Sequence, residues 1–505
     1  MKKVFVAACI LLLLGMIGWK VSEPWREAKK EENQLLNTSD AKGIEHRITI
    51  CGDEWLGYLI FRSPRFRSEM EKRAIAVNFK NEPDFQARFE MLDSGDCDLV
   101  CATIDSFLLN GESTNYPGVI VFGIDESYGG DAVIATEGIA TLDDLRAENI
   151  KGAFVGFSPS EFLLKSQVAH FEIENLKTNL PSFRTDDAQT AYNRLKNGDA
   201  DFAVLWEPFV SKSLREIPGA TRLIDTRQAR SVIYDVSIAS RSLVSEKPAV
   251  VQAITDVYFD TLNYYSSDPE EFRKLAKKDS GESESNADTM LSGIRFLDLK
   301  GNRDMINGQG ELRLTDAVAN ITRILVDVGD LSTDPLEGNP RLIVNSGFLQ
   351  KSSSSMASNA STQAEPLQRF FAPLDETAWD ALWEKRTGTL LEKPITFGVG
   401  QATIPEEFQQ ELLEATQKLV HYPGHRIIVQ AHVSPGSNKE ADLALSQERA
   451  NAIRDCLIQK GKISEHRVHA VGRGGEEPLA KESGEGLRSW KRRCRRARIY
   501  LAEDT

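Results

Sequence analysis

Two stretches of the chain, FQARFEMLDSGDCDLVCAT at 85–103 and TAYNRLKNGDADFAVLWEP at 190–208, share one pattern. Each contains Leu-x-x-Gly-Asp-x-Asp followed by an apolar run, and the two glycines, Gly95 and Gly198, stand 103 residues apart. A glycine at this point typically closes a helix in the left-handed conformation, and the apolar run after it is typical of a buried strand. The repeat therefore predicts two helix–turn–strand units, each in its own α/β half.

Apolar runs flank both units and extend this prediction. They lie at 47–51, 74–79, 119–122 and 152–156. Strands that alternate with helices are typical of α/β domains. The whole chain has 505 residues, of which 41% are hydrophobic, and this length predicts about two to four domains rather than one core. We therefore expect two α/β lobes between residues 46 and 348.

Four further motifs accompany the repeat: Trp55-Leu56-Gly57-Tyr58, SYGGDA at 127–132, TLDDL at 141–145 and Trp206-Glu207-Pro208. In this order and spacing, residues 46–348 resemble the nitrate/sulfonate/taurine type of periplasmic solute-binding protein, which has the type II fold of ABC-transporter receptors. The resemblance implies two lobes that close by a hinge on a ligand between them. It places the second lobe at about 139–232, with crossings between the lobes near 135–138 and 233–235.

The ligand of such a fold meets loops after strand ends and the amino termini of helices, where free N–H groups receive polar atoms. Hydroxyls and helix starts suit an anion, whereas aromatic rings beside carboxylates suit a cationic or heteroaromatic ligand, and the sequence leaves both open. The candidate ligand-binding residues are Trp55, Tyr58, Thr103, Asp105, Ser127, Tyr128, Ser158, Ser160, Trp206 and Glu207.

Residues 46–348 lack the side-chain combinations that catalysis requires. Their two histidines, His46 and His170, neighbour no Cys, no carboxylate pair at metal-ligand spacing and no Gly-x-Ser-x-Gly motif. We therefore expect no enzyme activity, no metal and no cofactor. Cys51 either forms a disulfide with Cys97 or Cys101, which an extracytoplasmic location permits, or these cysteines are buried free thiols.

The amino terminus indicates a location in the cell envelope. After Met1, Lys2 and Lys3, the run from 4 to 19 carries no charge. A small-x-small cleavage site is missing from the polar stretch that follows, which favours an uncleaved anchor at 1–21 and a charged stalk at 22–45. We expect an inner-membrane protein with its bulk in the periplasm; a cleaved signal peptide would leave the chain soluble in the periplasm.

A Ser/Ala-rich segment separates the lobes from the carboxyl-terminal part. Residues 349–393 contain the run KSSSSMASNASTQAE, which is typical of a flexible linker, and an aromatic segment at 370–383 that we expect to pack on the following domain. From residue 394 the pattern alternates strands and helices. Its expected strands are 395–399, 426–431, 467–471 and 497–501, and its expected helices are 405–421 and 439–460.

Residues 394–505 look like the OmpA-like peptidoglycan-binding domain, an α/β sandwich. The motifs that match are ITF at 395–397, AHVSPGS at 431–437, LSQERA at 445–450, GRGGEEP at 472–478 and RRARI at 495–499. The fold class of the whole chain is thus α/β: a two-lobe type II periplasmic-binding-protein fold followed by an OmpA-like sandwich, with an N-terminal membrane helix.

The OmpA resemblance also implies a peptidoglycan site. In that family an aspartate after the second strand and the arginine of Leu-Ser-x-x-Arg-Ala bind the zwitterionic end of diaminopimelate. Arg449 keeps the arginine, but Ser434 stands where the family has Asp, and Asp442 replaces an asparagine two helical turns before the arginine. We expect peptidoglycan-binding residues at Ser434, Asp442, Arg449, Arg495 and Arg496. The basic run RSWKRRCRRAR at 488–498 is expected to extend the paired arginines into a solvated loop and strand.

Net charge excludes a general nucleic-acid binder. The chain carries −14, whereas phosphate binding needs an excess of Lys and Arg. We expect an extracytoplasmic receptor, tethered to inner membrane and peptidoglycan, that captures a small organic or anionic solute for transport or sensing, with an ABC permease as a possible partner. The alternative is an envelope scaffold with a degenerate cleft that links the inner membrane to the cell wall.

Overall fold

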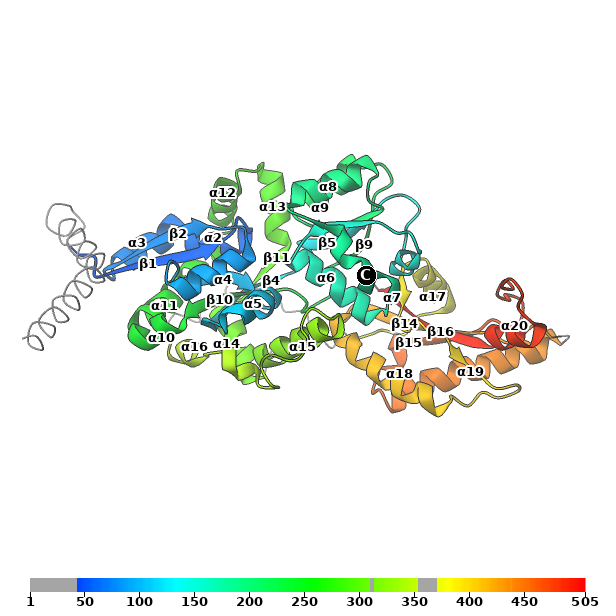
Figure 1. Cartoon of the computed structure of the whole chain (residues 1–505). Coiled ribbons are helices and arrows are strands. Elements are labelled where there is room, and N and C mark those ends of the chain that lie inside the picture. The colour runs from blue at the N-terminus through cyan, green and yellow to red at the C-terminus, as the bar shows by residue number, and fades with distance from the viewer. Residues whose placement is uncertain (1–42, 309–312, 353–369, 437, 505) are drawn as a thin grey trace, which may run out of the picture.

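The computed structural model describes residues 43–308, 313–352, 370–436 and 438–504. The expected anchor and stalk therefore lie outside the described residues, except for the last residues of the stalk. Figure 1 shows an elongated molecule in three parts, with the start of the described chain at one end, a middle lobe, and helix α20 (Leu487–Cys494) at the opposite end. Within the described ranges, no helix is long and apolar enough to cross a bilayer.

The first lobe is built on a six-stranded sheet in the order β11-β4-β10-β3-β1-β2. Strands β1, β2 and β3 run parallel, whereas β10 is antiparallel to both β3 and β4. The sheet is therefore mixed, and buried apolar side chains cover both of its faces. The strands are β1 (His46–Gly52), β2 (Ile75–Asn81), β3 (Leu99–Thr103), β4 (Gly118–Ser127), β10 (Tyr234–Ser240) and β11 (Ile294–Phe296).

Helices cover this sheet on its two faces. Apolar side chains of α2, α3 and α11 belong to one core, and those of α4, α5 and α15 to the other. The helices of this lobe are α2 (Leu59–Arg62), α3 (Pro64–Glu71), α4 (Phe85–Ser94), α5 (Ile104–Asn110), α10 (Arg241–Glu246), α11 (Pro248–Ser266), α12 (Pro269–Ser280), α13 (Glu284–Ser292), α14 (Leu299–Asn307), α15 (Leu314–Asp327) and α16 (Gly347–Lys351).

The second lobe has a five-stranded sheet in the order β7-β6-β8-β5-β9. Its strands are β5 (Asp131–Ala135), β6 (Gly152–Val155), β7 (Arg184–Thr185), β8 (Phe202–Trp206) and β9 (Thr221–Asp225). Its helices are α6 (Pro159–His170), α7 (Glu174–Asn179), α8 (Ala188–Asn197) and α9 (Phe209–Glu216).

The sequence repeat forms the two predicted helix–turn–strand units. Helix α4 ends at Gly95 with φ +83° and leads into β3, and α8 ends at Gly198 with φ +76° and leads into β8. Positive φ is the conformation that glycine adopts without steric cost.

The chain crosses between the lobes at two points. The first crossing lies between the end of β4 at Ser127 and the start of β5 at Asp131, which is earlier than the predicted 135–138. Gly129, with φ +92°, permits the turn there, and the apolar run after it is a strand of the second sheet rather than the end of the first. The second crossing joins β9 to β10, close to the predicted position.

The carboxyl-terminal domain has a sheet in the order β12-β16-β14-β15, with β13 paired to β16. Its strands are β12 (Arg386–Thr389), β13 (Ile395–Thr396), β14 (His425–Ala431), β15 (Val468–Gly472) and β16 (Arg496–Glu503). Its helices are α17 (Glu376–Trp383), α18 (Glu406–Lys418), α19 (Lys439–Gln459) and α20. The aromatic segment packs on this domain as predicted, because Trp379 stacks on His469 with ring centroids 4.7 Å apart.

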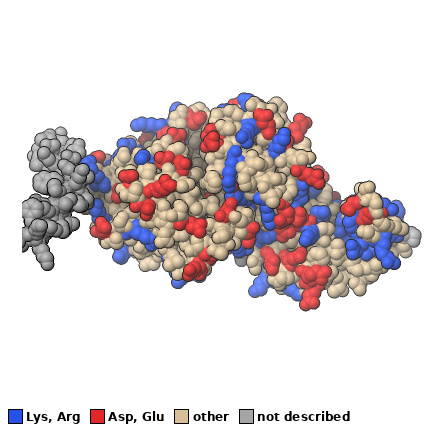
Figure 2. All heavy atoms as spheres, in the orientation of Figure 1, with Lys and Arg blue, Asp and Glu red and all other residues tan. Residues whose placement is uncertain are grey.

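Two expectations for this domain were wrong in detail. The predicted strand at 395–399 is only two residues long, and the start of the basic run forms helix α20 instead of a loop. Helix α20 is held by Arg493, whose guanidinium binds Glu485 at 2.6 Å, and by the Trp490 indole, which donates to the Leu479 carbonyl at 2.6 Å. Figure 2 shows Lys and Arg side chains gathered over this end of the molecule.

The carboxyl-terminal domain packs tightly against the second lobe. The rings of His170 and His421 stack with centroids 4.8 Å apart, and the Tyr422 hydroxyl lies 2.8 Å from His170 Nδ1. The Arg230 amide donates to the His421 carbonyl at 2.7 Å, and Thr389 donates to Asp143 at 2.5 Å. A buried apolar cluster continues from the first lobe through the second lobe into this domain.

The cysteines of the first lobe are free thiols. Cys51, Cys97 and Cys101 are all buried, and none forms a disulfide. Of the two possibilities that the sequence left open, the structure therefore has the buried thiols.

Candidate functional sites

Strand register brings two buried carboxylates side by side at the end of the first sheet. Asp235 on β10 pairs with Asp125 on β4 and with Thr103 on β3. The Tyr58 hydroxyl donates a hydrogen bond to Asp235. All four side chains are buried. Directly opposed residues lie on the same face of a sheet, so Asp125 and Asp235 form one acidic site.

Two more buried carboxylates, Asp131 and Asp105, are near enough that the charge of Asp131 acts on Asp125 and Asp235 and that of Asp105 acts on Asp131. Ser127 donates to Asp131 Oδ2 at 2.6 Å, at the first residue of β5. Asp105 lies in the first turn of α5, where hydrogen bonding from Thr103 and from the Ser106 amide only partly offsets the effect of burial on its pKa. We call Asp105, Asp125, Asp131 and Asp235 the acid cluster.

Trp55 spans the acid cluster. Its indole nitrogen lies beside the Asp125 carboxylate over Gly57, where a β-carbon would collide with both groups. The far edge of the same ring lies 3.0 Å from the position that a β-carbon of Gly130 would occupy, and Ser127 Oγ lies 3.3 Å from that position. The two glycines therefore let Trp55 reach from Asp125 to the crossing between the lobes.

Burial makes the acid cluster hard to ionise. It raises the pKa of Asp105 and of Asp131 to about 7, and the pKa of Asp125 to about 8. The pKa of Asp235 is also raised well above its ordinary value, by burial and then by the charge of Asp125. In the described part of the chain, none of the four forms an ion pair with Lys, Arg or His. Removing a carboxylate from water without a counter-charge favours its neutral form.

The structure brings together five of the ten predicted ligand residues and uses several others elsewhere. Trp55, Tyr58, Thr103, Asp105 and Ser127 surround or belong to the acid cluster. The Tyr128 ring lies 5.0 Å from the Arg227 guanidinium and 4.9 Å from that of Arg230. Ser158 donates to the Val155 carbonyl, and Glu207 accepts from Ser211 at the start of α9. Trp206 pairs with Asp131 in the second sheet, and the Ser160 hydroxyl is buried without a hydrogen-bond partner in the described structure.

Sequence reasoning left Asp125, Asp131 and Asp235 out of the predicted ligand-binding residues. All three stand at the polar ends of apolar runs, in VFGIDES, DAVIA and VIYDVS. The sequence feature that could have identified them is an acidic residue next to an apolar run, because a carboxylate buried beside a strand needs a partner.

A second site lies in the carboxyl-terminal domain around Arg449 on α19. Its side chain is fully buried and donates to three backbone carbonyls: those of Gln401 at 2.8 Å, Gly398 at 2.8 Å and His432 at 3.1 Å. A guanidinium has five N–H groups, so two remain for a ligand. No carboxylate forms an ion pair with Arg449 within the described ranges, and burial followed by the charge of Arg495 lowers its pKa to about 10.

The other predicted peptidoglycan residues lie on both sides of Arg449. Arg495 donates to the Phe397 carbonyl at 3.2 Å, and the Arg449 guanidinium lies 4.9 Å from the Phe397 ring. Arg496 is nearly buried and contacts the Glu477 carbonyl instead. Two helical turns before Arg449, about 10 Å along the axis, Asp442 directs its carboxylate at Gly436, in the loop that holds Ser434. The Asp442 carboxylate therefore lies close to the loop that holds Ser434.

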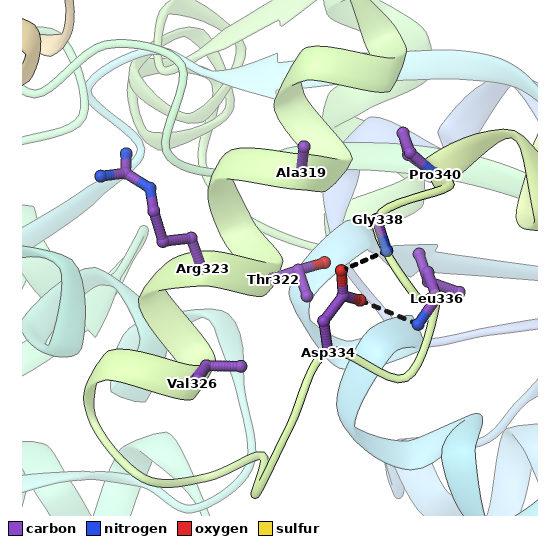
Figure 3. A pocket seen from close by; sticks show the side chains of 8 residues that line it. All are labelled: Ala319, Thr322, Arg323, Val326, Asp334, Leu336, Gly338 and Pro340. Carbon is purple, nitrogen blue, oxygen red and sulfur yellow. Dashed lines mark hydrogen bonds between the residues drawn. The ribbon is translucent and has the colours of Figure 1, made fainter.

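A separate pocket of about 250 Å³ lies between α15 and the loop after it. Its lining includes Thr322, Arg323, Asp334 and Leu336 (Figure 3). The Asp334 carboxylate accepts from the amides of Leu336 and Gly338 at 2.8 and 2.7 Å, and Figure 3 shows Arg323 directed away from it. The Asp334 carboxylate of this pocket thus stabilises the loop to which it belongs. No set of His, Cys, Asp and Glu side chains in the described residues is arranged to hold a metal ion.

Comparison with known proteins places the carboxyl-terminal domain. Residues 396–492 match the OmpA family, so this part of the chain is an OmpA-family domain. The peptidoglycan-associated lipoprotein of Brucella melitensis is 34% identical over 86 residues, which cover 17% of this chain and 51% of that protein. The chain thus spans about half the length of the curated relatives it matches.

The two lobes are similar to solved periplasmic binding proteins. The ligand-binding component of an ABC-type import system from Staphylococcus aureus aligns with TM-score 0.46 and 11% identity, over 62% of this chain and all of that one. The periplasmic aliphatic sulphonate binding protein of Escherichia coli aligns with TM-score 0.40 and 18% identity, over 50% of this chain and 85% of that one. Because these TM-scores are below 0.5, the two-lobe architecture rests on the strand order described above.

Proposed function

We propose that this protein is an envelope receptor whose OmpA-family domain binds peptidoglycan while its two lobes capture a small extracytoplasmic solute. The geometry of Arg449 is the main support for peptidoglycan binding. Arg449 is fixed by three backbone carbonyls, keeps two N–H groups, and lacks a carboxylate partner in the described structure. A guanidinium held in this way is prepared for a ligand carboxylate.

Charges of both signs in this domain suit a zwitterionic ligand. Arg449 and Arg495 supply positive charge near Phe397, while Asp442 supplies negative charge beside the loop of Ser434. In this proposal, the carboxylate of the diaminopimelate end binds Arg449, and its ammonium group binds Asp442 with the help of Ser434. The peptidoglycan-associated lipoproteins among the relatives support this assignment.

The shape of the molecule supports a tether. The described chain begins at one end, and the OmpA-family domain forms the opposite end (Figure 1). In our proposal, the apolar segment at 4–19 anchors the first end in the inner membrane, the bulk lies in the periplasm, and the solute is passed to an ABC permease or its presence is reported.

Co-sedimentation of the full chain with purified sacculi tests the wall-binding half. We expect the wild type to be retained, and Arg449→Lys and Asp442→Asn each to lower the affinity at least tenfold. Arg454→Lys is the matched control on the same helix, where Arg454 pairs with Asp455 at the surface. Melting curves establish that each variant is folded. Equal retention of all four proteins would remove Arg449 and Asp442 from the site.

A second candidate function is an envelope scaffold that binds no solute. The buried apolar cluster that continues through both lobes and into the OmpA-family domain favours it, because such packing opposes lobe opening. The two functions differ in one measurement: a receptor melts at a higher temperature with its solute, whereas a scaffold melts at the same temperature with every solute.

A further inference from the structure

The acid cluster is distinguished from the neighbouring carboxylates by the absence of counter-cations. Asp53, close by, binds Arg88 at 2.5 Å, and Glu126 pairs with both Arg230 and Arg295. Lys165, the cation whose charge reaches Asp105, is held at 2.5 Å by both Glu161 and Asp330. The cations of this region are therefore bound to other acids, and the four buried aspartates have no counter-cation within the described structure.

Unpartnered polar groups on α11 and β10 lie near the same cluster. The Tyr258 hydroxyl on α11 is fully buried without a hydrogen-bond partner, and the charges of Asp125 and Asp235 act on it. Ser237 Oγ, two residues after Asp235 and thus on the same strand face, is also buried and unpartnered. Buried polar groups are nearly always paired, so such a concentration indicates a missing partner that donates hydrogen bonds.

The chemistry of these groups specifies the partner. A bound cation would supply the counter-charge that the ionised form of these acids lacks. Ionised carboxylate oxygens accept hydrogen bonds from N–H groups and repel a sulfonate or a carboxylate. Trp55 and Tyr58 add aromatic surface beside the acids, which suits an organic cation. A metal ion is disfavoured, because no three of the described acidic, His and Cys side chains are arranged as metal ligands.

We propose that the acid cluster, with Trp55 and Tyr58, is the binding site for a small primary or secondary alkylammonium solute. This proposal rests on the solute-capture half of the proposed function and names its substrate class. A quaternary ammonium offers no N–H donor and would leave the orphaned oxygens unpaired, so the site discriminates against it. Asp131 comes from the second lobe and the other three acids from the first, so the cation holds the two lobes together.

Thermal melting of the full chain at pH 8 with a panel of probes tests the proposal. The probes are putrescine, butylamine, tetramethylammonium, 1,4-butanediol, butanesulfonate and Zn²⁺, each at millimolar concentration. Putrescine or butylamine is expected to raise Tm, since a ligand present at 100 times its Kd stabilises the folded state by about 2.7 kcal/mol. The other probes are expected to leave Tm unchanged.

Variants separate a ligand role from a structural one. Asp105→Asn is expected to raise the Tm of the unliganded protein, because it removes an unpaired buried acid, and to abolish the shift with amines. Asp199→Asn, the same change at an exposed site in the repeat, should alter neither. Tyr258→Phe, a second variant that keeps the ring, should weaken amine binding.

Other results with these probes would contradict particular parts of the amine-binding proposal. A shift with butanesulfonate, or with Zn²⁺ alone, would overturn the amine assignment while the receptor function stands. Equal shifts with tetramethylammonium and butylamine would refute the need for N–H donors. No shift with any probe would overturn the amine proposal and favour the scaffold.

Discussion

At the level of single residues, Ser434 is the departure from the OmpA pattern that removes a negative charge. A hydroxyl accepts a hydrogen bond from an ammonium group, but a carboxylate adds a charge, and charged hydrogen bonds are stronger by about 1 kcal/mol or more. Ser434→Asp is therefore expected to raise the affinity for sacculi about fivefold to tenfold. The measurement is co-sedimentation at low salt. Ser464→Asp adds the same charge at another exposed position of this domain and should have no effect.

The acid cluster predicts an unusual dependence of stability on pH. A free Asp titrates near 3.9, whereas burial raises the pKa of Asp105 to about 7. The folded state therefore holds its proton more tightly than the unfolded state does. This contribution to stability is complete below about pH 3.9 and is lost as pH rises through about 7. As pH rises from 5.5 to 8.5, the unfolding free energy of the wild type should therefore fall by about 2 kcal/mol more than that of Asp105→Asn. The figure is 1.36 kcal/mol for each pH unit between 5.5 and the pKa.

Chemical denaturation at the two pH values measures this difference. Asp199→Asn serves again as the control and should follow the wild type. An identical pH dependence for wild type and Asp105→Asn would show that Asp105 keeps an ordinary pKa in the folded protein.

The sequence indicated some site residues and not others for physical reasons. Arg449 and Asp442 were expected from the resemblance to the OmpA family, whose motif is local in the sequence. In the structure, Arg449 donates to the His432 carbonyl and Asp442 lies beside Gly436, both near the loop of Ser434. Asp131 was missed because its place in the site depends on the crossing at Gly129, which brings a strand of the second sheet beside the first. Glu207 was assigned to the cleft from its motif, but its carboxylate binds Ser211 locally.

At the scale of the element, two kinds of glycine are expected to respond differently to mutation. Gly198 closes α8 with φ +76°, and a β-carbon there would contact nothing, so Gly198→Ala should cost only backbone strain, about 1–2 kcal/mol. Gly57 has no positive φ, but a β-carbon there would strike Asp125 and Trp55. Gly57→Ala should weaken amine binding as well as stability. Denaturant unfolding and the amine-induced Tm shift measure the two effects; a loss of amine binding in Gly198→Ala would contradict this division.

The helices and strands were largely predictable because their patterns are local. The repeat with Gly95 and Gly198, the two long helices of the carboxyl-terminal domain and most of its strands occur where the sequence indicated. Helix α20 was not predicted, because it depends on Arg493 reaching acids earlier in the chain, and charge density alone resembles a solvated loop.

At the scale of the whole molecule, the contact between the second lobe and the OmpA-family domain is expected to weaken in acid. Burial lowers the pKa of both His170 and His421, whose rings stack in this contact. Their contribution to stability is present above the unfolded pKa near 6.5 and is lost as pH falls below it. From pH 7.5 to 5.5 we therefore expect the unfolding free energy to fall, because the unfolded state binds protons at both histidines more readily than the folded state does.

Calorimetry shows whether the contact couples the two parts. One cooperative transition is expected at pH 7.5, and two separate ones at pH 5.5. His466→Gln, at an exposed histidine, should behave as the wild type. Two transitions already present at pH 7.5 would mean that the domains unfold independently.

We propose that the OmpA-family domain of this chain binds peptidoglycan through Arg449. Calorimetric titration of a soluble, diaminopimelate-containing muropeptide into the full chain tests it most directly. We predict one site per chain, with Kd raised at least tenfold by Arg449→Lys and unchanged by Arg454→Lys. No binding by the wild type, or the same Kd for wild type and Arg449→Lys, would contradict the claim.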